Sequence, residues 1–353
     1  MPINVLVVDD SAFMRRAITK LLEIEPEISV CASARNGEEA IAKTIQFKPD
    51  VVTMDVEMPG MGGLDAVREI MAQCPTPIIM VSALTQHGAE TTFRALDLGA
   101  VDFIAKPDSA YVNISDVARD LVEKVRVFAG RPVRPRRTPS APEPPARSLD
   151  LPDRSGRESF TCVALGTSTG GPVALSRIIP RIPANFPIPI VIVQHMPPGF
   201  TRPLADRLNA QSALRVVEGH DGLTLHAGLA VIAPAGKQLR LRGSGEAVSI
   251  ALGPDDADSL HVPSVDVMTA EVARVYGAGS LGVILTGMGQ DGVLGLRRIK
   301  EAGGYVVGQE AASCVVYGMP RAAAQAGLVD RALPLDEVAA ALCELTNTSF
   351  ARS

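Results

Sequence analysis

The stretches INVLVVDDS (3–11) and PDVVTMDVEMPGMGG (49–63) each carry a short apolar run that ends in aspartate. Asp9 and Asp10 close the first run, and Asp55 closes the second. Parallel strands that end in carboxylates bring them together at one edge of a sheet, where open α/β folds bind ligands. Three crowded acids repel each other unless a divalent cation lies between them, and oxygen-only ligation beside a phosphate suits Mg²⁺. The pattern therefore predicts a phosphate-acceptor site with Asp55 as the acceptor.

The first third of the chain alternates apolar runs with amphipathic stretches. Strands are expected at 3–8, 28–33, 50–54, 77–82 and 101–104, and helices at about 12–24, 37–46, 63–72, 88–98 and 114–128. Strands that alternate with helices form parallel βαβ units. Runs such as VLVV and VVTM are apolar on both faces, as buried parallel strands are. This part of the chain is therefore predicted to be a doubly wound parallel sheet.

Composition bounds the remaining possibilities. A length of 353 residues is typical of about two domains, and 46% hydrophobic residues are enough for large cores. The net charge of −5 argues against nucleic acid as a partner. Five scattered cysteines indicate a reducing compartment rather than a disulfide framework. With no visible signal peptide and no apolar run of about 18–20 residues, we expect a cytoplasmic protein without membrane insertion.

A segment rich in Pro and Arg, RPVRPRRTPSAPEPPARSLDLPDRSGRE (131–158), separates two halves. Such a composition cannot build a core, so we interpret 129–158 as a linker, with a proline-rich docking peptide as the alternative. Alternation then resumes, with strands expected at 161–166, 188–194, 213–217, 229–233, 247–251, 281–286, 304–308 and 328–331. Turn residues within 229–251 predict a β-hairpin that decorates the second sheet.

Two further polar residues stand at strand ends in the first half. Ser82 ends IIMVS, and Lys106 follows VDFIA. An ammonium group would neutralise a phosphoryl group on Asp55, and a hydroxyl would hydrogen-bond it. Each residue alone has an ordinary interpretation as a turn or surface residue. As an ordered set with the three acids, they predict a phosphorylation switch.

The segments VVDDS, MDVEMPGMGG, MVSA and FIAKP together resemble the response-regulator receiver domain over residues 1–128. The resemblance implies a five-stranded flavodoxin-like fold in which a histidine kinase phosphorylates Asp55. It also implies a site for Mg²⁺ and a set of switch residues. The implied metal ligands are Asp10, Asp55 and the carbonyl of Glu57, with Asp9 in support, and the switch residues are Ser82, Phe103 and Lys106.

The second half contains a candidate nucleophile. In ALGTSTGGP (164–172), Ser168 fits the G-x-S-x-G pattern, in which glycines permit a sharp turn that exposes the hydroxyl at a sheet edge. The helix that follows would favour a developing oxyanion. A Gly-rich turn of this kind can instead hold a phosphate or serve only as a turn, so the motif alone leaves these alternatives open.

A candidate base and a candidate acid also follow predicted strands. His195 directly follows PIPIVIVQ, and Asp291 lies in the Gly-rich loop after LGVILT. A nucleophile, its base and the group that orients the base need such a shared edge. Asp266, in HVPSVDVM, is the strongest rival of Asp291. Four more acids also compete with it: Asp221, Asp255, Asp256 and Asp258. The other histidines fall in predicted loops or helices and lack this setting: His87, His220, His226 and His261.

The segments GTSTGGP, QHMPPGFT, HVPSVDVM and LTGMGQDG, after a receiver and a Pro-rich linker, resemble the chemotaxis protein-glutamate methylesterase (CheB) family. The resemblance implies that Ser168 is the nucleophile, His195 the general base and Asp291 its partner. Thr169 and Met288 stand where that family lines the site. The expected architecture is a receiver over 1–128, a linker over 129–158 and a Rossmann-like esterase domain with a β-hairpin over 159–350.

The resemblance implies phosphorylation-activated hydrolysis of glutamate γ-methyl esters on chemoreceptor helices, together with deamidation of glutamines. The expected partners are chemoreceptors and a chemotaxis histidine kinase, and the expected state is a monomer. Mg²⁺ is expected in the receiver, and no cofactor is expected for the ester chemistry. Two alternatives stay open: a non-enzymatic module that binds a partner, and a receiver-controlled esterase for a small molecule.

Overall fold

A computed structural model describes residues 2–106, 114–131, 159–245, 247–254 and 260–348. The chain divides into two compact units, 1–141 and 142–353, and each is described by itself. Almost all of the predicted linker, 129–158, lies outside the described residues, so its interpretation stays a prediction.

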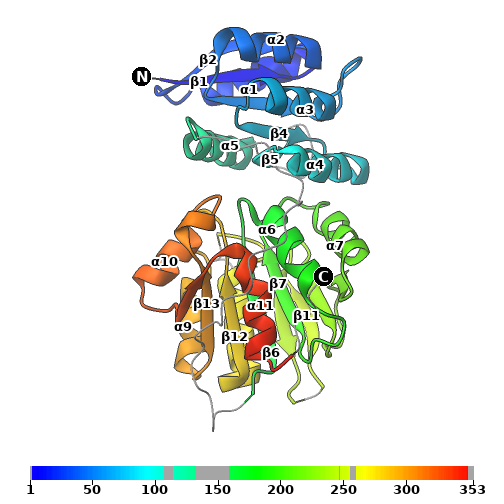
Figure 1. The fold of residues 1–353 in the computed structure, drawn as a ribbon, viewed down its shortest axis with the longest axis vertical. Helices are drawn as coiled ribbons and strands as arrows, with labels where there is room; N and C mark the ends of the chain where they lie inside the picture. Colours follow the sequence, from blue (N-terminus) through cyan, green and yellow to red (C-terminus); the bar gives the residue numbers. More distant parts are fainter. Residues whose placement is uncertain (1, 107–113, 132–158, 246, 255–259, 349–353) are drawn as a thin grey trace. The chain divides into compact units, whose positions relative to one another are not determined.

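The first unit, blue to cyan in Figure 1, is a five-stranded parallel sheet with the order β2-β1-β3-β4-β5. This order is that of flavodoxin-like doubly wound folds, as predicted. Its strands are β1 (Ile3–Val8), β2 (Ile28–Ala34), β3 (Val51–Asp55), β4 (Ile78–Ser82) and β5 (Asp102–Ala105). Its helices are α1 (Ala12–Leu22), α2 (Gly37–Phe47), α3 (Gly63–Gln73), α4 (Gln86–Leu98) and α5 (Ile114–Phe128).

Burial and capping explain these elements. All five residues of β3 and all five of β4 are buried, as expected for central parallel strands covered on both faces. Helix α1 buries Met14, Ile18 and Leu22, which the helical period places on one face. The side chain of Ser11 caps its first turn by accepting a hydrogen bond from an amide. The sheet ends that carry the acids are thus held between packed helices.

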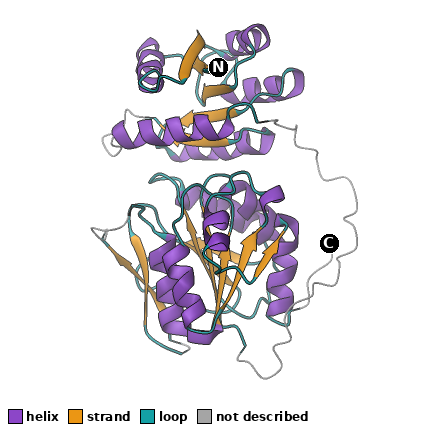
Figure 2. Ribbon diagram, turned by 90° about the vertical axis from the view of Figure 1, so that its left-hand side faces the viewer, coloured by secondary structure: helices purple, strands orange, loops and turns teal. Residues whose placement is uncertain are grey.

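The second unit contains a seven-stranded parallel sheet with the order β14-β13-β12-β6-β7-β9-β8. Figure 2 shows its helices packed against the strands. The strands are β6 (Cys162–Thr167), β7 (Ile190–Gln194), β8 (Arg215–Glu218), β9 (Leu229–Ile232), β12 (Ser280–Ile284), β13 (Tyr305–Gln309) and β14 (Arg331–Leu333). The helices are α6 (Gly171–Ile178), α7 (Thr201–Gln211), α8 (Val265–Tyr276), α9 (Val293–Glu301), α10 (Met319–Gln325) and α11 (Leu335–Leu345).

The order of this sheet determines where a ligand site belongs. From β6 the chain proceeds through β7 to β8 and β9 on one side, then returns to add β12, β13 and β14 on the other. The topological switch therefore lies between β6 and β12, and ligands of open α/β sheets bind outside the carboxyl ends of the strands at such a point. Doubly wound parallel sheets in both units agree with the fold class predicted from the sequence.

The predicted hairpin exists, but its boundaries differ from the prediction. β9 belongs to the main sheet, whereas β10 (Gln238–Arg242) and β11 (Ser249–Gly253) form a separate antiparallel pair. Its apolar side chains, including Leu239 and Ile250, join the same hydrophobic core as the parallel strands. In β10, with the sequence QLRLR, polar residues alternate with leucines, so this strand lacks the continuous apolar run that marks the buried parallel strands.

The last strand also begins later than predicted. The sequence predicted a strand at 328–331, whereas β14 is Arg331–Leu333. Residues 326–328 instead complete the end of α10, where Gly327 has a φ of +69°. The amide nitrogens of Gly327 and Leu328 donate back to carbonyl groups of that helix. Because those amides already donate to carbonyl groups of the helix, they cannot pair with a neighbouring strand, and β14 begins after them.

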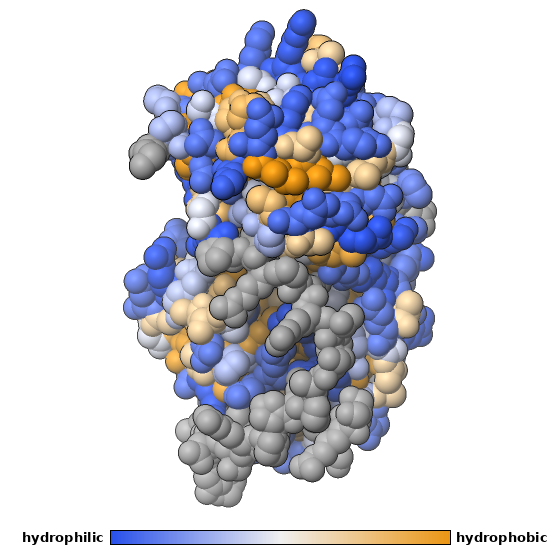
Figure 3. Space-filling model, turned by 45° about the horizontal axis from the view of Figure 1, so that its top comes forward, coloured by the Kyte–Doolittle hydropathy of each residue, from blue (hydrophilic) through white to orange (hydrophobic). Residues whose placement is uncertain are grey.

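On the face in Figure 3, hydrophilic residues surround smaller apolar areas. Large apolar side chains are exposed at Phe13, Ile24, Ile45, Phe47, Leu260 and Leu294. None of the helices in the described part of the chain has the length and apolar character needed to cross a membrane.

Gly63 provides a test of how tightly α3 packs against β3. A Cβ atom at this position would lie 2.0 Å from the carbonyl oxygen of Asp55, a contact that real structures do not show. We expect Gly63→Ala to destabilise the first unit by roughly 1–3 kcal/mol, because the helix must move away from the strand. At Gly62 the nearest atom to a Cβ is 3.9 Å away. Urea unfolding should therefore show a smaller loss for Gly62→Ala, and equal losses would contradict the packing argument.

Candidate functional site

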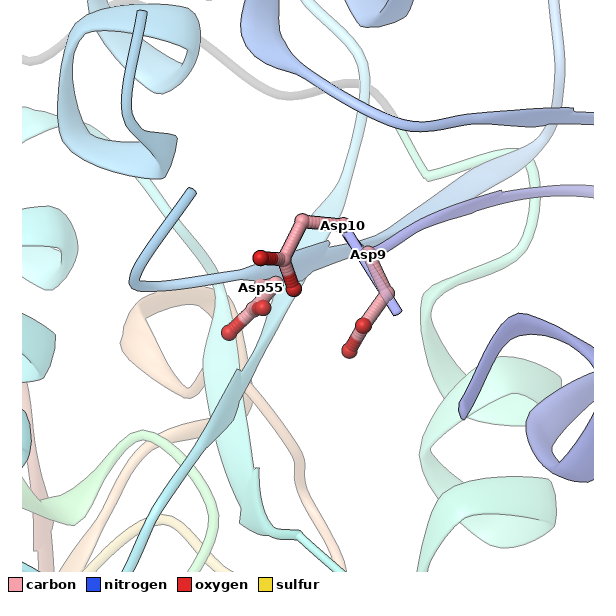
Figure 4. Close-up of side chains that lie close together, drawn as sticks. All are labelled: Asp9, Asp10 and Asp55. Atoms are coloured by element: carbon pink, nitrogen blue, oxygen red, sulfur yellow. The ribbon is translucent and has the colours of Figure 1, made fainter. Parts of the chain in front are cut away.

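The first unit gathers three carboxylates at its sheet edge. Asp9 and Asp10 follow β1, and Asp55 ends β3, so the pairing of these two strands places the acids side by side (Figure 4). One carboxylate oxygen of each acid lies within 4.8 Å of the others. Asp9 and Asp55 are buried and Asp10 is exposed. The cluster is thus open to solvent on the side of Asp10.

Lys106 is the cation closest to this cluster among the ion pairs of the described residues. Its Nζ lies 2.8 Å from Oδ2 of Asp55 and 3.3 Å from Oδ2 of Asp9. Even so, burial, with the charge of Asp9, raises the pKa of Asp55 to about 6, although Lys106 opposes the shift. Burial also raises the pKa of Asp9. One ammonium group therefore does not balance the three acids.

The donor set fits a magnesium ion. Among the described residues, the two oxygens that pair with Lys106 have no well-aligned hydrogen-bond donor, and the cluster consists of oxygen atoms alone. Hard cations such as Mg²⁺ prefer such ligands and keep several waters on an open side. The backbone amide of Glu57 donates to Oδ1 of Asp55 at 3.3 Å, so this peptide also adjoins the cluster.

The predicted switch residues lie on β4 and β5. Ser82 is fully buried at the end of β4, which pairs with β3, and the amide of Lys106 donates to its carbonyl oxygen at 2.8 Å. Phe103 is buried in β5 and packs edge-to-face on Phe93, with ring centroids 6.2 Å apart. The buried Lys124 donates to the carbonyl oxygen of Phe103 at 2.6 Å. The backbone of Phe103 is therefore tied to α5.

The second unit places Ser168 on a sharp turn between β6 and α6. The amide of Ser168 donates to the carbonyl oxygen of Thr286 at 3.0 Å, and its own carbonyl oxygen accepts from the amide of Gly171 at 2.8 Å. Gly170 has a φ of +80°, which favours glycine, at the cap of α6. Ser168 is only partly buried. Its hydroxyl therefore lies on a rigid turn before a helix N-terminus.

His195 and Asp291 are hydrogen-bonded to each other. Nε2 of His195 lies 2.7 Å from Oδ2 of Asp291. Since an ionised carboxylate only accepts, this contact places the imidazole proton on Nε2. Nδ1 of His195 is buried and has no hydrogen-bond partner in the described part of the protein. That nitrogen thus has a free lone pair, the property a general base needs.

Asp291 is held as an anion by four donors. Besides His195, it accepts from the hydroxyl of Ser264 at 2.9 Å and from the amides of Val265 at 2.7 Å and Asp266 at 2.9 Å. These groups form the N-terminus of α8, where a negative charge is favourable. Although burial works against ionisation, the hydrogen bond and charge of His195 and these amides hold the pKa of Asp291 well below its usual range.

In the described part of the chain, Asp266, the rival acid, makes no hydrogen bond with His195. Its Oδ1 accepts from the amide of Gly295 at 2.8 Å, in the first turn of α9. Burial, together with the charge of Asp291, raises the pKa of Asp266 to about 6, although the amides of Gly295 and its neighbours oppose the shift. The geometry therefore joins His195 to Asp291 and assigns Asp266 to the support of the loop that carries Asp291.

Loop 287–289 adjoins the serine turn. A Cβ atom at Gly287 would lie 2.8 Å from Cβ of Ser168, so the absence of a side chain allows the close approach. Met288 follows and is partly buried. Thr169 is buried, and its carbonyl oxygen accepts from the hydroxyl of Thr286 at 2.9 Å.

Sequence reasoning missed three contacts. His261 stacks on His195, with ring centroids 4.1 Å apart, although it follows no parallel strand. Ser264 donates to Asp291, and Gln194 bonds to two carbonyl groups at this edge. The position of His261 and Ser264 in the segment HVPSVDVM, which the sequence analysis singled out for its acid, was the only available signal.

Fold and sites together define a two-domain response regulator whose output unit has the layout of a serine hydrolase. The family model of the response regulator receiver domain matches residues 5–113, and that of the CheB methylesterase matches residues 163–342. The chain belongs to the CheB methylesterase family. Receiver domains in general carry a magnesium-dependent phosphorylation site, and the acid cluster lies within the matched range.

Relatives match along nearly the whole chain. A protein-glutamate methylesterase/protein-glutamine glutaminase of Desulfitobacterium hafniense is 43% identical over 381 residues, which cover 97% of each chain. One from Vibrio parahaemolyticus is 44% identical over 360 residues, which cover 96% of this chain and 97% of the relative. The crystal structure of the Thermotoga maritima CheB methylesterase catalytic domain matches with a TM-score of 0.52 and 42% identity, covering 53% of this chain and all of that one.

The two acids near His195 can be separated by substitution. Asp291→Asn should lower the turnover number for ester hydrolysis by about 10⁴, as loss of the orienting carboxylate does in other triads, with little change in KM. Asp266→Asn removes a charge without touching His195 and should cost far less. Steady-state kinetics on both variants would measure the difference. A larger loss for Asp266→Asn would show that the geometric assignment is wrong.

Proposed function

We propose that this protein hydrolyses glutamate γ-methyl esters on the cytoplasmic helices of chemoreceptors, releasing methanol, and that phosphorylation of Asp55 activates it. The observation that carries this proposal is the 2.7 Å hydrogen bond between His195 and Asp291 beside the Ser168 turn. The names of the relatives supply the substrate class, and they also support deamidation of glutamine side chains.

The residues support acyl transfer through serine. Ser168 Oγ attacks the ester carbonyl while Nδ1 of His195 takes its proton, and Asp291 stabilises the resulting imidazolium through Nε2. His195 then returns the proton to the departing methoxy group as methanol. A water molecule, deprotonated by the same nitrogen, attacks the acyl-serine, and His195 returns this proton to Ser168 Oγ as the glutamate leaves. With a glutamine substrate, the leaving group is ammonia, and the remaining steps are identical.

The developing oxyanion needs donors beside Ser168. The amide of Thr169 begins the turn into α6, whose N-terminus favours negative charge. An amide of loop 287–289 is the second candidate, because Gly287 brings this loop against Ser168. Met288 lines the same place. These groups require no cofactor for the ester chemistry.

In the first unit, an oxygen of Asp55 would attack the phosphoryl group of a histidine kinase. Asp10, Asp55 and the carbonyl oxygen of Glu57, with Asp9 in support, would hold Mg²⁺, which neutralises charge on the phosphoryl oxygens when bound. Lys106 lies 2.8 Å from Asp55 and pairs with the added charge, and Ser82 offers a hydroxyl. Phe103, tied to α5 by Lys124, would respond as the switch.

A direct experiment tests the activity. Methanol release from methylated receptor should be measured with and without a small-molecule phosphodonor and Mg²⁺. Release that the phosphodonor increases supports the proposal, whereas binding to receptor without release would favour a non-enzymatic partner module. Hydrolysis of small esters that receptor does not inhibit would favour a small-molecule esterase. We place the reaction in the cytoplasm, with the protein acting as a monomer and without nucleic acid.

Ser168→Ala tests the nucleophile. Alanine fits a position that held serine, so the fold should be retained and the thermal unfolding midpoint should change little. Methanol release should fall by several orders of magnitude, leaving about 10³–10⁴-fold acceleration over water from binding and oxyanion contacts. Activity within a few-fold of that of the parent protein would exclude Ser168 as the nucleophile.

Asp55→Asn tests the switch. A phosphodonor with Mg²⁺ should raise the methanol release rate of the full chain, because the added charge pairs with Lys106 and favours the active state. It should not raise the rate of Asp55→Asn or of a fragment comprising residues 159–353. The fragment should be faster than the unphosphorylated full chain. We infer that the unphosphorylated receiver inhibits the second unit, so a fragment no faster than the full chain would instead make the receiver an activator or a localisation tether.

A further inference from the structure

Gln194 is the last residue of β7 and stands directly before His195. Its side chain is 1% exposed, so the amide group is enclosed by protein. Nε2 donates to the carbonyl oxygen of Ser168 at 2.9 Å and to the carbonyl oxygen of His195 at 2.8 Å. Both acceptors are carbonyl groups, which cannot donate, so only the nitrogen of the amide can face them. The orientation of this side chain is therefore determined.

These two bonds lie where the strand ladder ends. β6 and β7 pair in register up to Thr167 and Gln194, and the amide of His195 donates to the carbonyl oxygen of Thr167 at 3.1 Å. Beyond this bond, Ser168 turns into α6 and His195 enters a loop. The side-chain amide of Gln194 then replaces a backbone hydrogen bond between the strands, because its nitrogen donates to the carbonyl groups of both Ser168 and His195.

The opposite side of the amide is confined as well. Oε1 of Gln194 is buried without a hydrogen-bond partner in the described structure. A Cβ atom at position 171 would lie 1.9 Å from Oε1 and 2.6 Å from the hydroxyl of Thr167. Only glycine thus lets the start of α6 approach the amide. A buried acceptor left unpaired costs stability, and such groups in native proteins call for a functional or structural reason.

We propose that Gln194 is a positioning residue that sets the separation of Ser168 and His195 for proton transfer. The inference rests on the proposed serine mechanism, in which the hydroxyl of Ser168 must reach the free Nδ1 of His195 within hydrogen-bond distance. A displacement of about 1 Å between reacting groups can cost on the order of 10² in rate. The unpaired Oε1 is the consequence of aiming the nitrogen at both carbonyl groups.

Gln194→Met in the full chain tests this role, because methionine has similar length and cannot hydrogen-bond these carbonyl groups. We expect kcat for methanol release to fall by about 10² while KM changes by less than about threefold. The rate at which a small organofluorophosphonate labels Ser168 should fall in parallel, since labelling needs the same proton transfer. Ser280→Ala is the matched control. It removes a buried hydroxyl that donates to the carbonyl oxygen of Val272 at 3.2 Å, at the other end of the strands.

The control should lose stability and keep its kcat, when both variants are assayed well below their unfolding midpoints. Gly171→Ala is a second variant that removes no hydrogen-bonding group but pushes on Oε1, and it should reproduce the loss in kcat with unchanged KM. An unchanged kcat and labelling rate in both Gln194→Met and Gly171→Ala would overturn the inference. So would a loss in Gln194→Met no larger than in Ser280→Ala. Failure of the parent protein to release methanol would instead contradict the proposed function.

Discussion

Parallel pairing of β12, β6 and β7 determines where every reactive group of the second unit can lie. Their registers bring the carboxyl ends of the three strands to one edge, with β6 in the middle. Ser168 follows the central strand, His195 follows its neighbour on one side, and the loop that carries Asp291 follows the neighbour on the other. Three residues far apart in sequence are therefore adjacent because of strand order alone, and side-chain contacts only refine the arrangement.

Two aspartates show how environment divides one chemical group between two roles. Asp291 meets a histidine, a serine hydroxyl and two helix amides, which keep its pKa well below the usual range despite burial. Asp55 is buried with one ammonium group, and its pKa rises to about 6. Because that folded-state pKa lies above the ordinary value, ionisation of Asp55 lowers stability as the pH rises through this range. A cation that binds the ionised cluster reverses this loss, so Asp55 suits a site that takes up charged groups.

Strand ends were the part of the site that the sequence predicted well. Apolar runs that stop at a polar residue locate Asp55, Ser168 and His195, because a buried parallel strand forms a continuous apolar run that can be recognised in the sequence. The sequence favoured Asp291 over Asp266 because Asp291 follows a predicted strand, but it did not show that amides at the N-terminus of α8 bind Asp291. The boundaries of β10 and β11 were missed because these strands lack a continuous apolar run. Their apolar residues alternate with polar ones and pack on the core from one face. The stacking of His261 on His195 could not be predicted, because it corresponds to no periodic pattern in the sequence.

The glycines around Ser168 separate two physical demands that one motif combines. Gly170, with a φ of +80°, supplies a backbone conformation that other residues rarely adopt. Gly171 and Gly287 have no such φ, yet a Cβ atom at either would collide with Gln194 or Ser168. Their role is close approach rather than flexibility: they allow α6 and loop 287–289 to press against the serine turn from two sides. A substitution at Gly170 should therefore strain the turn itself, whereas one at Gly171 or Gly287 should displace a neighbouring group from an otherwise intact turn.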